Sequence, residues 1–68
     1  METLTGIIVA IHCDRNYGFI DGDDGERYFF HRMGVVNSTF EELREGMPVS
    51  FLATDSKKGI RAIGVVLM

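Results

Sequence analysis

The sequence is short of cysteine, of basic residues and of long apolar runs. Cys13 is the only cysteine, so no internal disulfide can form and a cysteine-based zinc site lacks its other ligands. No apolar run approaches the roughly 20 residues that a membrane-spanning helix requires. Residues 1–4 lack the basic and apolar segments of a secretion signal. We therefore expect a cytoplasmic protein that is neither secreted nor inserted in a membrane.

Acidic residues outnumber basic ones, with ten Asp and Glu against seven Lys and Arg and a formal net charge of −3. A partner bound mainly through phosphate groups requires a patch of cations, because much of the affinity comes from the release of counterions. The deficit of cations counts against such a partner. For a nucleic-acid ligand, stacking must then carry more of the affinity.

A chain of 68 residues has room for one domain, residues 1–68, and one small core, without a catalytic cleft between domains. No Ser-His-Asp, Cys-His or paired-carboxylate arrangement is supported by the spacing of the residues. His12 and His31 lack the partners of a zinc shell, and the acidic residues of 21–26 lack the ligand order of a calcium loop. We predict a binding protein with no metal or cofactor and no enzymatic activity.

Strand-like segments make up most of the chain. They are rich in β-branched and aromatic residues or alternate in polarity, and they lie at 4–13, 16–20, 26–31, 47–54 and 60–67. Clusters of Gly, Asp and Asn close the hairpins, while residues 32–46 form a longer connection with a short helical turn at 39–43. The pattern predicts an all-β protein built on a small closed or nearly closed sheet, which also removes exposed strand edges.

The second and third of these segments are apolar on both faces. Successive side chains of a strand point to opposite sides, and a small barrel has only one interior. In one register Gly18, Ile20, Tyr28 and Phe30 face inward and Tyr17, Phe19, Phe29 and His31 face outward; the other register exchanges the two sets. Either way rings meet solvent on neighbouring strands, and such a patch needs an explanation. Unstacked nucleobases are a ligand that would explain it, since stacking of a base on an aromatic ring contributes about 1–3 kcal/mol per base.

Several motifs in this order resemble those of the bacterial cold-shock proteins. Residues 16–20, Asn-Tyr-Gly-Phe-Ile, are similar to the family's first ribonucleoprotein-type motif, Lys-Gly-Phe-Gly-Phe-Ile. Residues 28–31, Tyr-Phe-Phe-His, are similar to the second, Val-Phe-Val-His-Phe. The similarity runs without gaps from about Leu4 to Val66 and includes Gly6, Glu45-Gly46, residues 49–51 and Gly59.

The resemblance implies a five-stranded antiparallel barrel of the oligonucleotide/oligosaccharide-binding type, the OB fold. It also implies single-stranded RNA or DNA as ligand, often rich in pyrimidines, and a role in melting RNA structure or assisting transcription and translation. The stacking residues that it assigns are Tyr17, Phe19, Phe29, His31 and Phe40. The basic contacts that it assigns are Arg15, Lys58 and Arg61.

This chain departs from the family pattern on the first strand, where Ile7, Val9 and Ala10 replace two lysines and a tryptophan of the binding side. His12 stands where the family commonly has an asparagine, and Asn16 where it has a glycine. Arg32 stands in place of the phenylalanine that ends the second motif. Its guanidinium can stack on a base and pair with a phosphate, so Arg32 joins the candidate site.

Some of these residues have a second interpretation. The rings of residues 17–31 can belong to a crowded core, and Phe40 either covers the barrel edge as packing or extends the binding platform. Lys57, Lys58 and Arg61 are either a charged turn or phosphate contacts.

Two functional hypotheses follow. In the first, the chain binds single-stranded nucleic acid by stacking on surface aromatics and acts as an RNA chaperone or a regulator of transcription or translation. In the second, the same barrel is a protein-interaction module with weakened nucleic-acid binding, which self-associates through the apolar strip of Ile7 and Val9. A monomer or a weak homodimer is compatible with both.

Overall fold

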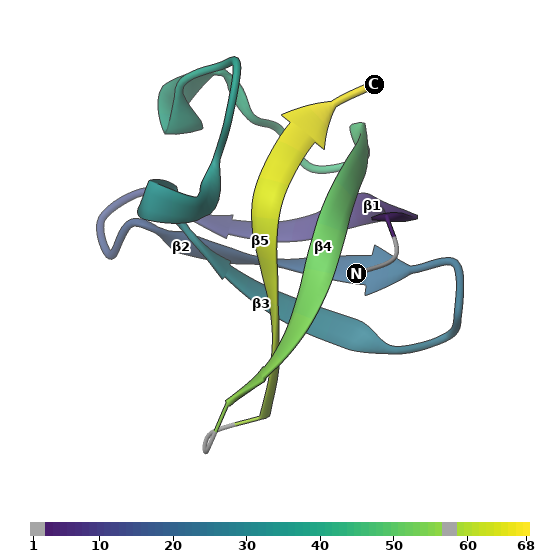
Figure 1. The fold of residues 1–68 in the computed structure, drawn as a ribbon. Helices are drawn as coiled ribbons and strands as arrows, with labels where there is room; N and C mark the ends of the chain where they lie inside the picture. The colour runs from purple at the N-terminus through teal and green to yellow at the C-terminus, as the bar shows by residue number, and fades with distance from the viewer. Residues whose placement is uncertain (1–2, 57–58) are drawn as a thin grey trace.

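The computed structural model describes residues 3–56 and 59–68. Five strands form a closed barrel in the order β1-β2-β3-β5-β4, and Figure 1 shows β4 and β5 crossing in front of the other three. Two short 3-10 helices, η1 and η2, lie in the connection from β3 to β4. The elements are β1 (Thr3–His12), β2 (Tyr17–Gly22), β3 (Arg27–His31), η1 (Arg32–Gly34), η2 (Phe40–Glu42), β4 (Pro48–Ser56) and β5 (Gly59–Leu67).

The five predicted strands are confirmed, with ends that differ by a few residues. The pairs β1–β2, β1–β4, β2–β3 and β4–β5 are antiparallel, as predicted. The contact that closes the barrel differs, because β3 and β5 run parallel and meet at Phe29 and Arg61. The first 3-10 helix, η1, was not expected from the sequence.

The core is formed by the inward side chains of all five strands together with two residues from the long connection. Ile8, Ile20 and Phe30 have no exposed surface, and Phe51 is 1% exposed. This is the register in which Gly18, Ile20, Tyr28 and Phe30 face inward, so Tyr17, Phe19, Phe29 and His31 lie on the outer face. The complete core is Ile8, Ile20, Tyr28, Phe30, Phe40, Leu43, Val49, Phe51, Ala62 and Val65.

Phe40 belongs to this core. It is 3% exposed, and its ring centroid lies 6.1 Å from that of Phe30. Its helix η2 begins at a cap in which the backbone N–H and the hydroxyl of Thr39 both donate to Glu42 Oε1, at 3.0 Å each. These bonds hold the pKa of Glu42 below its usual range. The assignment of Phe40 to the stacking platform is therefore wrong, because the β3–β4 connection turns its ring into the core.

Two local features explain where this chain keeps or replaces glycine. A Cβ at Gly18 would lie 2.5 Å from the carbonyl oxygen of Ala10 and 2.8 Å from the ring of Phe30, so no side chain fits there. Asn16 has φ of 61°, in the left-handed region. Asn tolerates that region better than most side chains, which is why it can replace the glycine of the family motif.

A β-bulge in β1 decides which of its residues face outward. The register shifts between Ile8, which pairs with Ile20, and Ala10, which pairs with Phe19. Ile8 and Ala10 therefore face opposite sides although they are two positions apart, because a bulge inserts one extra residue into the alternation. Downstream of the bulge His12 pairs with Tyr17 and shares its outer face. Among the described residues, no helix is long and apolar enough to cross a membrane.

Candidate nucleic-acid interface

Four ring-bearing side chains of β2 and β3 lie together on the outer face of the barrel. Tyr17 pairs with His31 across the two strands, and Phe19 pairs with Phe29. All four are half-buried, so each presents part of its side chain to solvent. The sheet thus brings together the stacking residues that the sequence predicts, apart from Phe40.

Within this face, His12, Tyr17 and Phe29 form what we call the ring stack. The ring centroids of His12 and Tyr17 are 4.7 Å apart with 25° between the planes. Those of Tyr17 and Phe29 are 5.3 Å apart with 27° between the planes. The guanidinium carbon of Arg61 lies 5.3 Å from the centroid of Phe29. Because β2 runs between β1 and β3, Tyr17 is covered on one side by His12 and on the other by Phe29.

Phe19 is oriented differently. Its plane makes angles of 88° with that of Tyr17, 89° with that of His12 and 73° with that of Phe29. These are edge-to-face arrangements, which aromatic pairs favour as well as offset stacking. No described ring lies parallel to Phe19, so none is stacked face to face on it.

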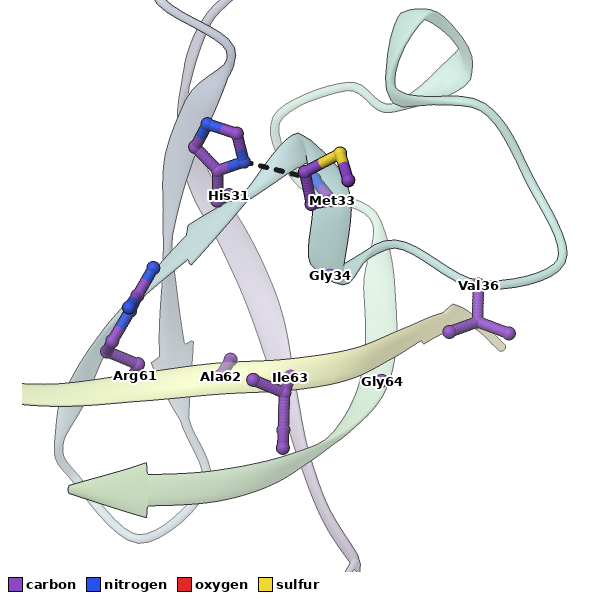
Figure 2. Close-up of a pocket in the computed structure, with 8 residues that line it drawn as sticks. All are labelled: His31, Met33, Gly34, Val36, Arg61, Ala62, Ile63 and Gly64. Atoms are coloured by element: carbon purple, nitrogen blue, oxygen red, sulfur yellow. Dashed lines mark hydrogen bonds between the residues drawn. The ribbon is translucent and has the colours of Figure 1, made fainter. Parts of the chain in front are cut away.

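His31 is fixed by a backbone contact. The N–H of Met33 donates to its Nδ1 at 3.1 Å, so the side chain caps the start of η1 (Figure 2). A ring nitrogen that accepts a hydrogen bond carries no proton, so in the neutral imidazole the proton is on Nε2. In that form, Nε2–H is the hydrogen-bond donor that the ring of His31 keeps.

An open pocket of about 530 Å³ begins at His31 and Arg61 and extends along η1 and β5 (Figure 2). Three of its side chains are apolar and exposed: Met33 by 85%, Val36 by 44% and Ile63 by 37%. The pocket continues the outer face beyond β3, and beyond His31 and Arg61 its side chains are apolar and carry no ring. Its lining is completed by Gly34, Ala62 and Gly64.

Most cations of the described residues already have an acceptor. Arg27 donates to both carboxylate oxygens of Asp21, at 2.7 and 3.3 Å, and holds the pKa of that carboxyl below its usual range. Arg32 pairs with Glu41 at 2.7 Å, so the candidate phosphate contact is made to a carboxylate of the same chain. Arg44 donates to the backbone carbonyls of Glu41 and Leu43.

Arg61 and Arg15 are the predicted cations that remain near the face. Arg61 lies over Phe29, as described above. Arg15 is exposed in the turn between β1 and β2, and within residues 3–56 and 59–68 its side chain makes no hydrogen bond or ion pair. Lys58 lies outside the described residues.

Apart from His12, the first strand presents little to a base or a phosphate. Ala10 is the outward partner of Phe19 and carries no ring, and Ile7, which pairs with Asp21, is 40% exposed. Val9 occupies the bulge and is half-buried. In the part of the chain that the structure describes, no group of three or more His, Cys, Asp or Glu could hold a metal ion.

His12 and Met33 belong to this surface but were not among the predicted site residues. The hairpin offers a signal for His12, because a four-residue turn from Cys13 to Asn16 places it opposite Tyr17. Met33 carries no comparable signal, since its exposure depends on the unexpected helix η1.

Comparison with known proteins agrees with this architecture. The model of the 'Cold-shock' DNA-binding domain matches residues 4–68. Cold shock protein 1 of Lactiplantibacillus plantarum is 36% identical over 61 residues, which cover 90% of this chain and 92% of that protein. Cold shock-like protein CspE of Bacillus anthracis is 34% identical over 64 residues, which cover 94% of this chain and 96% of that protein.

The fold is also similar to that of a solved structure, drosophila Unr CSD456, with a TM-score of 0.82 and 20% sequence identity. The superposition covers 98% of this chain and 27% of that one, and at this identity it speaks for the fold alone. The family model matches almost the whole chain, and the two bacterial relatives are themselves covered over more than nine tenths of their length. This chain belongs to the 'cold-shock' DNA-binding domain family, whose proteins bind nucleic acid and are not enzymes.

Proposed function

We propose that this protein binds single-stranded RNA or DNA by stacking unpaired bases on its outer aromatic face. The observation that carries the proposal is the grouping of Tyr17, Phe19 and Phe29 on the outside of adjacent strands, with Arg61 over Phe29. Base stacking contributes about 1–3 kcal/mol per base and tolerates any sequence. His31 adds a directed donor, Nε2–H, for a base edge.

The bound bases have to compete with contacts inside the protein. Tyr17 has a ring on each side, so a base reaches its face only if the neighbouring ring turns away, whereas Phe19 has no parallel neighbour among the described rings. We infer that Phe19 receives the first base. A protein that binds unpaired bases draws the equilibrium of an RNA hairpin toward its open form and needs no energy source to do so. This is the basis of an RNA-chaperone role, or of a regulatory role in transcription or translation, in the cytoplasm.

Phosphate contacts contribute less than stacking in this proposal. With Arg15, Arg61 and Lys58 as candidate contacts, two or three phosphates give a log–log dependence of affinity on salt of about −1.4 to −2.1, at about −0.7 per contact. The acidic net charge of −3 is consistent with such a shallow slope.

Fluorescence anisotropy of a labelled pyrimidine oligonucleotide, titrated at low salt with protein whose folding has been verified, tests the proposal. We expect saturable binding, and matched RNA and DNA strands then rank the two ligands. Folded protein that does not bind any strand up to high-micromolar concentration would remove the proposal.

The exposed Ile7 favours a second candidate function, a protein-interaction module that self-associates through β1. Light scattering of wild type against the double variant Ile7→Lys with Val9→Lys separates the two. A wild-type dimer that the double variant dissociates supports self-association. A wild-type monomer whose oligonucleotide binding tightens in the double variant shows that the strip is a lost nucleic-acid contact.

A further inference from the structure

We propose that the ring of His12 is a terminal nucleobase platform, which extends the aromatic face to the β1–β2 turn. The inference rests on the proposed function and adds a residue to the same surface. His12 replaces an aromatic contribution that β1 otherwise lacks, since the outward residue Ala10 carries no ring.

The geometry of the ring stack places His12 at its open end. The other end is closed, because Arg61 lies over Phe29. Tyr17, in the middle, is covered by Phe29 and by His12 itself. His12 is exposed, and Tyr17 is the only described ring that lies parallel to it. The outer face of its imidazole is therefore where a base can add to the stack without displacing a ring.

The outward position of His12 is a consequence of the bulge at Val9. Simple alternation would put His12 on the same side as the fully buried Ile8. The register shift instead pairs His12 with Tyr17 on the outer face and turns Ile11 inward opposite Gly18. Bulges are known to re-aim a side chain in this way.

The turn that follows His12 supplies a cation. The backbone N–H of Arg15 donates to the carbonyl oxygen of His12 at 3.1 Å, which fixes the turn next to the ring. The side chain of Arg15 is exposed there and close enough in sequence to meet the phosphate of a base stacked on His12. Asp14, exposed in the same turn, opposes that contact, so stacking is the main interaction expected at this position.

The absence of tryptophan from the sequence gives a direct readout. The variant His12→Trp places a single indole at the proposed platform, and its fluorescence reports stacking of a base on that ring. Titration with a short oligothymidylate at low salt should quench the fluorescence with the same midpoint as anisotropy of the labelled strand. The matched control is Met68→Trp, at a position that is 72% exposed beside Pro48 and outside the ring stack, and it should not be quenched.

Side-chain replacement provides the second measurement. His12→Ala should weaken binding by about 5- to 150-fold, the range expected for one lost stacking contact, and His12→Phe should restore most of the affinity. Unchanged binding by His12→Ala, together with an unquenched His12→Trp that still binds, would overturn the inference and leave the proposed function intact. If folded wild type does not bind any strand, that result would instead refute the proposed function.

Discussion

The guanidinium of Arg61 lies 5.3 Å from the ring centroid of Phe29, across the parallel contact that closes the barrel between β3 and β5. A cation over an aromatic face is held by the ring quadrupole, and an arginine can at the same time offer its fork of N–H donors to a phosphate. Under the proposed function, Arg61 would link the ring stack to the backbone of a bound strand.

Replacing Arg61 by Ala should weaken oligonucleotide binding and make the salt dependence shallower by about 0.7 in the log–log slope, the value for one phosphate contact on a single strand. Arg61→Lys keeps the charge but loses the planar group, so it should retain the slope and lose part of the affinity. Anisotropy titrations at several salt concentrations measure both quantities. An unchanged slope in Arg61→Ala would show that Arg61 only packs on Phe29.

Phe19→Ala and Phe29→Ala should each weaken single-strand binding by about 1–3 kcal/mol with little change in the midpoint of thermal unfolding. The reason is that both rings lie on the outer face and are half-buried, so each offers surface to the ligand as well as to its neighbours. The binding constant comes from anisotropy and the unfolding midpoint from circular dichroism. A large loss of stability with unchanged affinity would mean that the rings serve the fold and not the ligand.

Inward residues should show the opposite behaviour. Phe51→Ala and Ile20→Ala should destabilise the barrel by about 2–5 kcal/mol, because both side chains are buried and their removal leaves a cavity. Chemical denaturation gives the free energy of unfolding. Affinity measured on the folded fraction should stay close to that of wild type, and a specific loss of affinity in these variants would contradict the assignment of faces.

The extent to which the sequence predicts this molecule can be seen at particular residues. Alternation and turn residues suffice for the strands, but they leave two possible outer faces for β2 and β3. The motif resemblance selects one of the two, and the structure agrees with it, because Ile20 is fully buried and no side chain fits at Gly18. His12 is missed because a bulge resets the alternation along β1, so that only the pairing across the β1–β2 turn places it on the outer face. Phe40 is misplaced because tertiary packing against Phe30, across a long connection, decides which way its ring turns.

The ion pair between Arg32 and Glu41 predicts a variant that binds more tightly. Both side chains are about half exposed, 49% and 57%, so the pair contributes little to stability and can be broken without loss of the fold. Glu41→Gln leaves the guanidinium available to a phosphate, which should raise affinity and steepen the salt slope by about 0.7. Glu45→Gln, an exposed residue that removes the same charge without freeing Arg32, is the matched control. Equal gains in affinity in the two variants would mean that the effect comes from the change in net charge and not from freeing Arg32.

The hairpin between β2 and β3 predicts a dependence of stability on pH. The hydroxyl of Tyr28, whose ring is buried, donates to Asp24 Oδ2 at 2.5 Å. This bond holds the pKa of Asp24 below its usual 3.8, and the same bond is the main cause that raises the pKa of Tyr28 from 10.0 to about 12. The stabilising contribution of Asp24 is therefore present above its unfolded pKa and is lost as the pH falls through its folded pKa.

For Tyr28 the sign is reversed. Its pKa is higher in the folded chain, so its contribution is complete below pH 10.0 and is lost as the pH rises toward about 12, where the unfolded chain releases the proton more readily. Urea unfolding of wild type and Tyr28→Phe at neutral and alkaline pH isolates this effect, because the other alkaline titrations are common to both proteins. We expect wild type to be the more stable at pH 7 and to lose that advantage between pH 10 and 12. An advantage that persists above that range would show that the hydroxyl proton does not carry it.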